Sequence, residues 1–240
     1  MRNRALSVLL FVFLFSICIK TEGQEAHSIV ESVAKKFRLV HDYQADAVIH
    51  TDIPFIKILP VRATIYFEKP DYFRVKAKGI AILPKQGFDQ MLHVLSDSTD
   101  YTSVFQGVSM ENGKPLALIN LIPLVDSVDL VLAKLWIDTT AKLLMKAQLT
   151  TKSNGTILSE YRYGSEAEYA LPDSVVFTID THKFKIPRAV AADINNNSAP
   201  EAEKGKENKK GRIHVRFEHY ILNKGIPKEI FKEKKEESEK

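Results

Sequence analysis

Cysteine is almost absent from this chain: the only one among 240 residues is Cys18, inside an apolar segment near the N-terminus. A single cysteine allows no internal disulfide, and a chain that loses this segment has no thiol chemistry. Cys18 is either a bystander in the apolar segment or the acylated residue of a lipoprotein. The bystander interpretation is favoured, because Ile17 stands where a lipoprotein leader normally has Gly, Ala or Ser.

A large excess of charge is also lacking, since 34 Lys and Arg residues face 30 Asp and Glu residues and the net charge is +4. Such a near balance provides no strong basic field for nucleic acid. The lysines alternate along predicted strands or lie in tails, where solvation accounts for them. We therefore expect no nucleic-acid partner.

Common enzyme motifs are missing as well, including a Gly-rich phosphate loop, G-x-S-x-G and H-E-x-x-H. Acidic pairs such as Asp126 with Asp129 stand where turns favour Asp. The nearest approach to a metal site is His214, Glu218 and His219, but strict alternation along a strand would turn His219 away from the other two. We expect no enzyme activity, no metal and no cofactor.

The N-terminus has the pattern of an export leader. Arg2 and Arg4 precede an apolar run over residues 5–19, which is shorter than the roughly 20 residues of a membrane-spanning helix. A polar shift at Lys20 and a small residue before Gln24 predict cleavage after residue 23. With no disulfide to form, the mature chain fits a bacterial periplasm, with lipid anchoring at Cys18 disfavoured.

The mature chain is expected to form one domain over residues 24–231. An amphipathic helix is predicted for residues 25–38, where apolar residues recur at helical spacing. Residues 188–210 are rich in Asn, Glu and Lys without an apolar period, which predicts a solvated, mobile loop. Residues 232–240 form a charged, flexible tail, and a break at residues 123–129 has room for a short helix.

Alternating apolar and polar residues predict about nine or ten strands with short connections. The strongest turn signals are Asn112-Gly113, which predicts a hairpin, and Lys69-Pro70-Asp71, between two alternating arms at residues 61–79. The strands are predicted in the two arms of residues 61–79 and at residues 43–50, 101–110, 115–121, 130–137, 143–151, 156–163, 175–180 and 211–222, with a further short apolar segment at residues 91–95. Consecutive antiparallel strands of this kind favour one strongly curved sheet, so the predicted fold class is α+β.

One face of these strands collects a large apolar set, which suits either a sealed core or the lining of a pocket for a hydrophobic ligand. Because only one clear helix is predicted to cover so many strands, we hypothesise an apolar cavity, with a sealed core as its alternative. The candidate ligand-binding residues are Ala45, Ala47, Ile49, Ala63, Ile65, Phe67, Phe73, Val75, Leu143, Met145, Leu149, Phe177, Ile179, Val215 and Phe217.

Several of these segments resemble the LolA-like family of bacterial envelope proteins. The letters YFEKPDYFRV at residues 66–75 are similar to that family's (K/R)-P-(D/N)-x-F turn. The order of Leu135-Trp136-Ile137-Asp138, Asn154-Gly155 and Leu171-Pro172-Asp173 is also similar to the family's, in a variant typical of Bacteroidota. The resemblance covers most of residues 25–230.

The resemblance implies a half-open β-barrel covered by the N-terminal helix and short lid helices, with an apolar cavity that takes lipoprotein acyl chains. In the best-known carriers an Arg before the turn proline holds the lid through helix carbonyls. Lys69 stands at this lid-lock position here, and it lacks the planar fork of donors that Arg presents.

The sequence therefore predicts a monomeric periplasmic carrier whose partners are lipoprotein acyl chains or another lipid, together with envelope membrane proteins. An RseB-like sensor or interaction module that binds a protein partner on the same fold is the alternative. A hydrolase would require a nucleophile and a His brought together inside the cavity.

Overall fold

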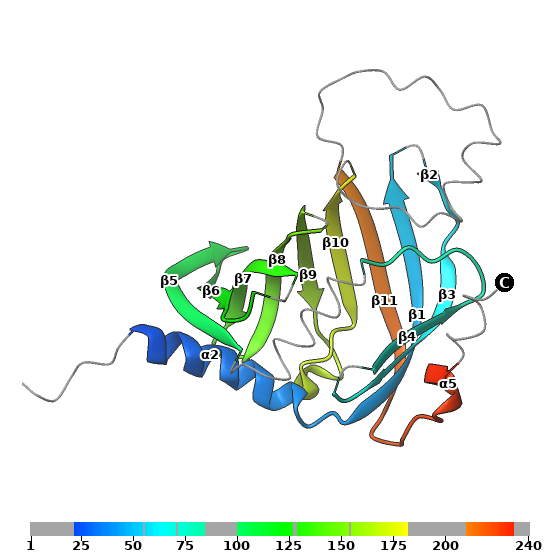
Figure 1. Ribbon diagram of the computed structural model, residues 1–240, viewed down its shortest axis with the longest axis horizontal. Coiled ribbons are helices and arrows are strands. Elements are labelled where there is room, and N and C mark those ends of the chain that lie inside the picture. The colour runs from blue at the N-terminus through cyan, green and yellow to red at the C-terminus, as the bar shows by residue number, and fades with distance from the viewer. Residues whose placement is uncertain are drawn as a thin grey trace, which may run out of the picture.

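The computed structural model describes residues 22–54, 56–70, 72–84, 100–126, 129–153, 155–181 and 210–232 (Figure 1). Residues 1–21 of the predicted leader lie outside this part of the chain. So do the apolar segment at 91–95, the predicted loop at 188–210 up to residue 209, and the tail after residue 232. Asp71 of the predicted hairpin turn is also outside it.

Most of the described elements are strands, which follow one another along the chain with few helices between them. In chain order they are α2 (Glu22–Phe37), β1 (Asp42–Ile53), β2 (Ile56–Lys57), β3 (Val61–Glu68), β4 (Tyr72–Ala77), β5 (Tyr101–Glu111), β6 (Lys114–Pro123), β7 (Leu130–Asp138), β8 (Leu143–Thr151), β9 (Gly155–Arg162), the 3₁₀ helix η1 (Ala167–Tyr169), β10 (Ser174–Asp180), β11 (Lys210–Leu222) and α5 (Glu229–Lys232).

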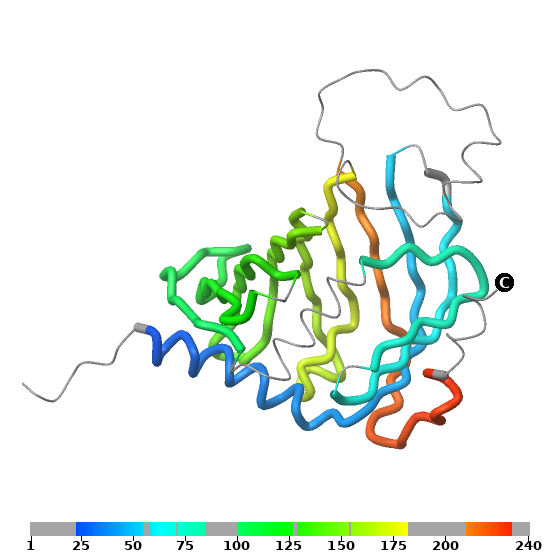
Figure 2. The backbone as a smooth tube through the Cα atoms, in the orientation of Figure 1, coloured from blue at the N-terminus to red at the C-terminus, as the bar shows by residue number. Residues whose placement is uncertain are grey.

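One antiparallel sheet contains all of these strands. Its order is β4-β3-β1-β11-β10-β9-β8-β7-β6-β5, and β2 pairs separately with β1. The edge strands β4 and β5 do not pair with each other, so the sheet curls without closing (Figures 1 and 2). The predicted fold class, a curved half-open barrel with few helices, is confirmed.

Helix α2 forms because its apolar residues recur on one side. Ala26, Val30, Val33 and Phe37 are buried, while residues 23–25, 27, 28 and 35 are exposed. The helix lies against β5 and reaches η1, and Figure 2 shows it crossing the lower end of the sheet. No helix in the described part of the chain is long and apolar enough to cross a lipid bilayer.

The two predicted hairpins are confirmed. Phe67 pairs with Phe73 across β3 and β4, so both side chains point to the same side of the sheet. Between β5 and β6, Asn112 and Gly113 have φ angles of 49° and 77°. Two consecutive positive φ angles are the requirement of a tight two-residue hairpin turn, and the Asn-Gly pair meets it at little cost.

The described part of the chain contains two short helices besides α2. Residues 124–126 and Asp129 form bends and turns rather than a helix. Within the described residues, the short helices are η1 and α5, and α5 packs beside β4 through Phe231 and Tyr72, whose ring centres lie 5.5 Å apart. Helix α2 is therefore the main helical cover of the sheet.

The helix is joined to the sheet by aromatic packing at the start of the fold. The ring of Phe67 lies 5.4 Å from that of Phe37 on α2 and 5.3 Å from that of Tyr43 on β1, measured between ring centres. Phe67 is fully buried. Its ring thus connects the helix, the first strand and the first hairpin.

Replacing Phe67 with Ala should lower the free energy of unfolding by about 3–5 kcal/mol, because the buried ring leaves a cavity between α2 and the sheet. Urea unfolding followed by circular dichroism measures this loss. Thr64→Ala is the control, since Thr64 lies on the opposite face of β3 and its hydroxyl bonds only the carboxylate of Asp46. Equal losses in the two variants would contradict the assignment of Phe67 to the joint.

Candidate functional site

The predicted ligand-binding residues share one side of the sheet, and they belong to a single hydrophobic cluster that also includes the apolar face of α2. We call this side the inner face. Twelve of the predicted residues are buried: Ala45, Ala47, Ile49, Ala63, Ile65, Phe67, Leu143, Leu149, Phe177, Ile179, Val215 and Phe217. Phe73, Val75 and Met145 are partly buried and pack against the same cluster.

The inner face extends further than the predicted set. It continues through β6 and β7, where Ile119, Leu121 and Leu135 are buried, and over a segment after β4, where Ile82 is buried. The alternation of apolar and polar residues at 115–121 and 130–137 already indicated that Ile119, Leu121 and Leu135 belong to one apolar face. Ile82 had no such signal, because the segment around it is not a strand.

A bulge in β8 breaks the alternation that assigned Met145 to this face. Trp136 of β7 pairs with Lys146 and Ile137 pairs with Leu144, so Met145 is the extra residue. Leu143 and Leu144 are consequently both buried, and Met145 is only half-buried. Leu144 is an inner-face residue that strict alternation misses.

A second bulge, in β11, overturns the expected direction of His219. Asp46 of β1 pairs with His219 and the next residue, Ala47, pairs with Phe217, so Glu218 is extra. His219 is therefore exposed on the outer side of the sheet, as His214 is. The expectation that these two histidines face opposite ways is wrong, although no three metal-ligating side chains come together in the part of the chain that the structure describes.

Polar side chains tie the C-terminal end of α2 to the sheet. The Lys69 ammonium donates to the carbonyl oxygen of Arg38, just beyond the helix, over 2.8 Å. The backbone N–H of Lys69 donates to the carbonyl of His41 over 3.0 Å. Burial and the nearby charge of Arg38 lower the pKa of the Lys69 ammonium. The side chain of Lys69 thus reaches one backbone carbonyl, that of the residue directly after α2.

Two further residues complete this attachment. The side-chain amide of Asn223 donates to the carbonyl of Leu39 over 3.0 Å, and its oxygen accepts from the N–H of His41 over 2.6 Å. On α2 itself, the Lys36 ammonium donates to the carbonyl oxygens of Ala141 and Ala167, over 2.9 and 3.2 Å. We call Lys36, Lys69 and Asn223 the helix clamp.

Small residues form a row on the inner face near the β4 edge. Ala77 of β4 pairs with Ala63 of β3, which pairs with Ala47 of β1. The three neighbouring strands therefore carry only methyl groups along this line, whereas Val61 on one side of Ala63 and Ile65 on the other carry larger side chains.

Two tyrosines beside the inner face use their hydroxyls structurally. The Tyr163 hydroxyl donates to the carbonyl of Leu144 over 2.7 Å, and the Tyr220 hydroxyl donates to that of Pro172 over 2.8 Å. Burial raises the pKa of both phenols well above the ordinary value. They remain protonated donors, and each bond connects two neighbouring segments of the sheet.

Histidines do not approach this apolar face within the described residues. His27, His41, His50, His214 and His219 are all exposed, and the remaining two lie in undescribed segments. A nucleophile paired with any of these five histidines inside the inner face is therefore excluded. The arrangement can cover and bind apolar material.

Comparison with known proteins gives a likeness in structure only. No protein-family model matches the sequence, and no curated protein matches it. A LolA superfamily protein from Nitrosomonas europaea is 13% identical, with a TM-score of 0.56 over 86% of this chain and 96% of that one.

Two other solved structures are similar to the same extent. A putative outer membrane lipoprotein-sorting protein domain from Vibrio parahaemolyticus has a TM-score of 0.57 at 8% identity, over 88% of this chain and 97% of that one. A DUF1329 family protein from Desulfovibrio piger has a TM-score of 0.57 at 10% identity, over 89% of this chain and 98% of that one. The half-open sheet with its helix against the inner face is the LolA-like fold.

Proposed function

We propose that this protein is a non-enzymatic periplasmic carrier, exported by its N-terminal leader, that binds lipoprotein acyl chains on the inner face for transfer towards the outer membrane. The fold supports this proposal, since one of its neighbours is described as an outer membrane lipoprotein-sorting domain. In this proposal the candidate residues from Ala45 to Phe217 line the binding site.

The observation that carries the proposal is the imbalance between the apolar face and its cover. Ten strands contribute to one hydrophobic cluster, and among the described residues α2 is the only helix longer than four residues. Ligand pockets are concave and lined mostly by apolar side chains, and a sheet face covered by one long helix can supply such a lining. In this proposal, movement of α2 opens the face.

The energies are compatible with such a movement. Each hydrogen bond of the helix clamp contributes on the order of 1 kcal/mol. Each methylene of an acyl chain contributes about 0.8 kcal/mol when it is buried. A long acyl chain can therefore offset both the broken clamp and part of the lost contact between α2 and the sheet.

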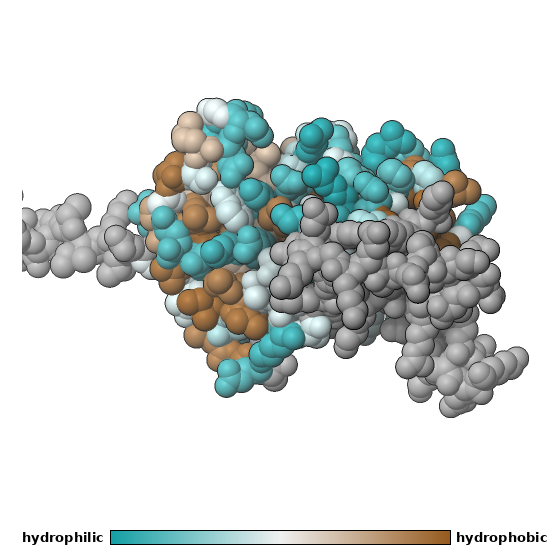
Figure 3. Space-filling view, turned by 90° about the horizontal axis from the view of Figure 1, so that it is seen from above, coloured by the Kyte–Doolittle hydropathy of each residue, from teal (hydrophilic) through white to brown (hydrophobic). Residues whose placement is uncertain are grey.

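An envelope sensor or interaction module that binds a protein partner is the second candidate function. Exposed apolar side chains at the ends of β6 and β7 favour it, namely Ile122, Leu124, Val125 and Val131, which are 45–64% exposed. Figure 3 shows hydrophobic surface gathered at this end of the molecule. Contiguous apolar surface of this kind marks interaction sites in other proteins.

Native mass spectrometry of the protein purified from its own host separates the two functions. The carrier proposal expects a fraction of molecules with added masses that match lipids or acylated peptides. A bound polypeptide without lipid would contradict the carrier proposal and favour the interaction module.

Adding bulk to the row of alanines should block loading. Ala77→Phe places a ring on the inner face at the edge strand, where the native side chain is only half-buried. We expect binding of a fluorescent fatty acid to weaken about tenfold, a change of about 1.4 kcal/mol. Titration by fluorescence gives the affinity.

Lys76→Phe is the matched control, because it adds the same ring to the opposite face of the same strand. It should bind the fatty acid like the parent protein, and both variants should keep the parent melting temperature. If Ala77→Phe folds and binds as tightly as Lys76→Phe, the inner face does not hold the chain.

Loosening the helix clamp should speed exchange of a bound acyl probe. Lys69→Leu removes the donor to the Arg38 carbonyl at a cost of about 1 kcal/mol, which corresponds to about fivefold faster exchange. Lys69→Arg should slow exchange, because a guanidinium can donate to more than one carbonyl. Stopped-flow displacement of the fluorescent fatty acid measures both rates.

Lys152→Leu provides the comparison for this experiment. Its ammonium also donates to a backbone carbonyl, that of Asp126 over 2.6 Å, but it is exposed and lies outside α2 and the helix clamp. Exchange in this variant should equal that of the parent. Parent-like exchange in both Lys69 variants would rule out Lys69 as a determinant of opening.

A further inference from the structure

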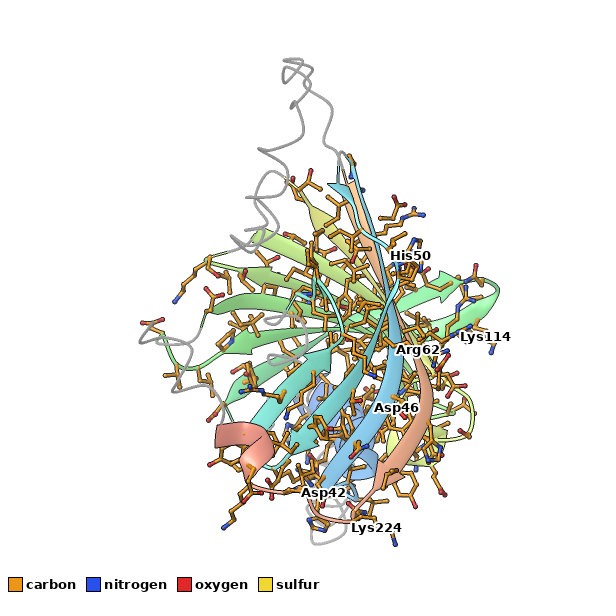
Figure 4. All side chains as sticks on the ribbon, turned by 90° about the vertical axis from the view of Figure 1, so that its right-hand side faces the viewer. Asp42, Asp46, His50, Arg62, Lys114 and Lys224 are labelled. Carbon is orange, nitrogen blue, oxygen red and sulfur yellow. The ribbon has the colours of Figure 1, made fainter. Side chains whose placement is uncertain are left out.

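The outer side of the sheet brings two histidines from distant parts of the chain together. His50 of β1 is paired with His214 of β11 in the antiparallel register, and both are exposed. Their ring centres lie 6.1 Å apart, with 36° between the ring planes. Figure 4 shows the position of His50 along β1, beyond Asp46 and Asp42.

We propose that His50 and His214 form a binding site for a transition-metal ion on the outer face. Imidazole nitrogens bind such ions at about 2.0–2.1 Å, so two rings in neighbouring positions on one ion have centres roughly 4.5–5 Å apart, the lower value for the square-planar geometry of Cu²⁺. The observed separation exceeds these values by about 1–1.5 Å, which side-chain rotation of two exposed residues can remove without moving the strands.

The backbone beneath the two rings is held by the central pairing of the sheet. His214 is paired on both sides, with His50 of β1 and with Val176 of β10, whereas the pairing of β1 with β3 ends at Ile49, one residue before His50. The pairing of β1 with β11 is continuous from Ala47 with Phe217 to Asp52 with Arg212. The backbone of the two ligands therefore loses little conformational freedom when an ion binds.

Nearby charges do not oppose a cation strongly. Arg216, two residues from His214, lies 3.0 Å from the carboxylate of Glu218, and Arg62 lies 3.2 Å from the same carboxylate. On the other side of the pair, Arg212 is paired in register with Asp52. The two arginines that flank His214 on β11 thus each face a carboxylate-bearing residue.

The ligand set points to a class of ion. Imidazole ligands suit Cu²⁺, Ni²⁺ and Zn²⁺, and affinity for a given site rises to a maximum at Cu²⁺ in this series. No group of three His, Cys, Asp or Glu residues that could hold a metal occurs among the described residues. Water would therefore fill the remaining coordination positions. Among these ions we expect Cu²⁺ to bind most tightly.

This site is independent of the proposed acyl-chain site, because the two histidines project from the opposite side of the sheet. Its occupation would connect β1 and β11, whose sequence positions are more than 150 residues apart. The ion would stabilise the folded state in proportion to its concentration relative to the dissociation constant.

Calorimetric titration of the full chain with Cu²⁺ tests the proposal. His50→Ala and His214→Ala should each weaken one binding event by about tenfold or more, because each removes one of two ligands. The two single variants should weaken the same binding event, and the double variant should lose it, since no imidazole of the site remains. The melting temperature without metal should stay at the parent value in all three.

His219→Ala is the control, because His219 is also exposed on the outer face of β11 but is paired with Asp46. It should bind the same number of Cu²⁺ ions as the parent with the same affinity. The proposal is overturned if His50→Ala and His214→Ala titrate like His219→Ala, or if the two single variants weaken different binding events. His214→Gln, which keeps the size and polarity of the side chain, should behave like His214→Ala.

Discussion

The contact between the apolar face of α2 and the inner face of the sheet is the interaction on which the rest of the structure depends. Because β4 and β5 do not pair, the sheet cannot cover its own interior by closing into a barrel. Phe37, Phe67 and Tyr43 meet where the helix joins the sheet, and the burial of their rings offsets the exposure that an open sheet would otherwise suffer. The open edge follows from this strand order, and among the described residues α2 is the main helical cover of the sheet.

The contact between α2 and the sheet also shows how a stable fold would be compatible with the proposed binding of an acyl chain. The helix clamp holds α2 through backbone carbonyls, which are polar and directional contacts, while the helix itself buries only apolar side chains. Apolar burial is non-directional, so an acyl chain can replace a helix face without reproducing its geometry. Under the proposed function, a few hydrogen bonds would determine how readily the cover moves.

The two sides of the sheet carry different kinds of side chain. The inner side is a continuous apolar cluster, whereas the outer side of β1, β3 and β11 carries ion pairs and polar contacts such as Arg62 with Glu218 and Thr64 with Asp46. The histidine pair belongs to this polar side, where ligands are accessible to solvent. A carrier site and an ion site on opposite sides of one sheet would not compete for space.

Local patterns in the sequence determine much of this architecture. Alternation predicts the strands and assigns Phe67 and Phe73 to one face, Asn112-Gly113 predicts its hairpin, and helical spacing predicts α2, because each depends on residues close in the chain. The bulges at Met145 and Glu218, the pairing of His50 with His214 and the bond from Lys69 to the Arg38 carbonyl depend on the partner strand or helix. Only the tertiary structure decides them, since a pattern with a period of two residues contains no information about which strand lies alongside or where an extra residue is accommodated.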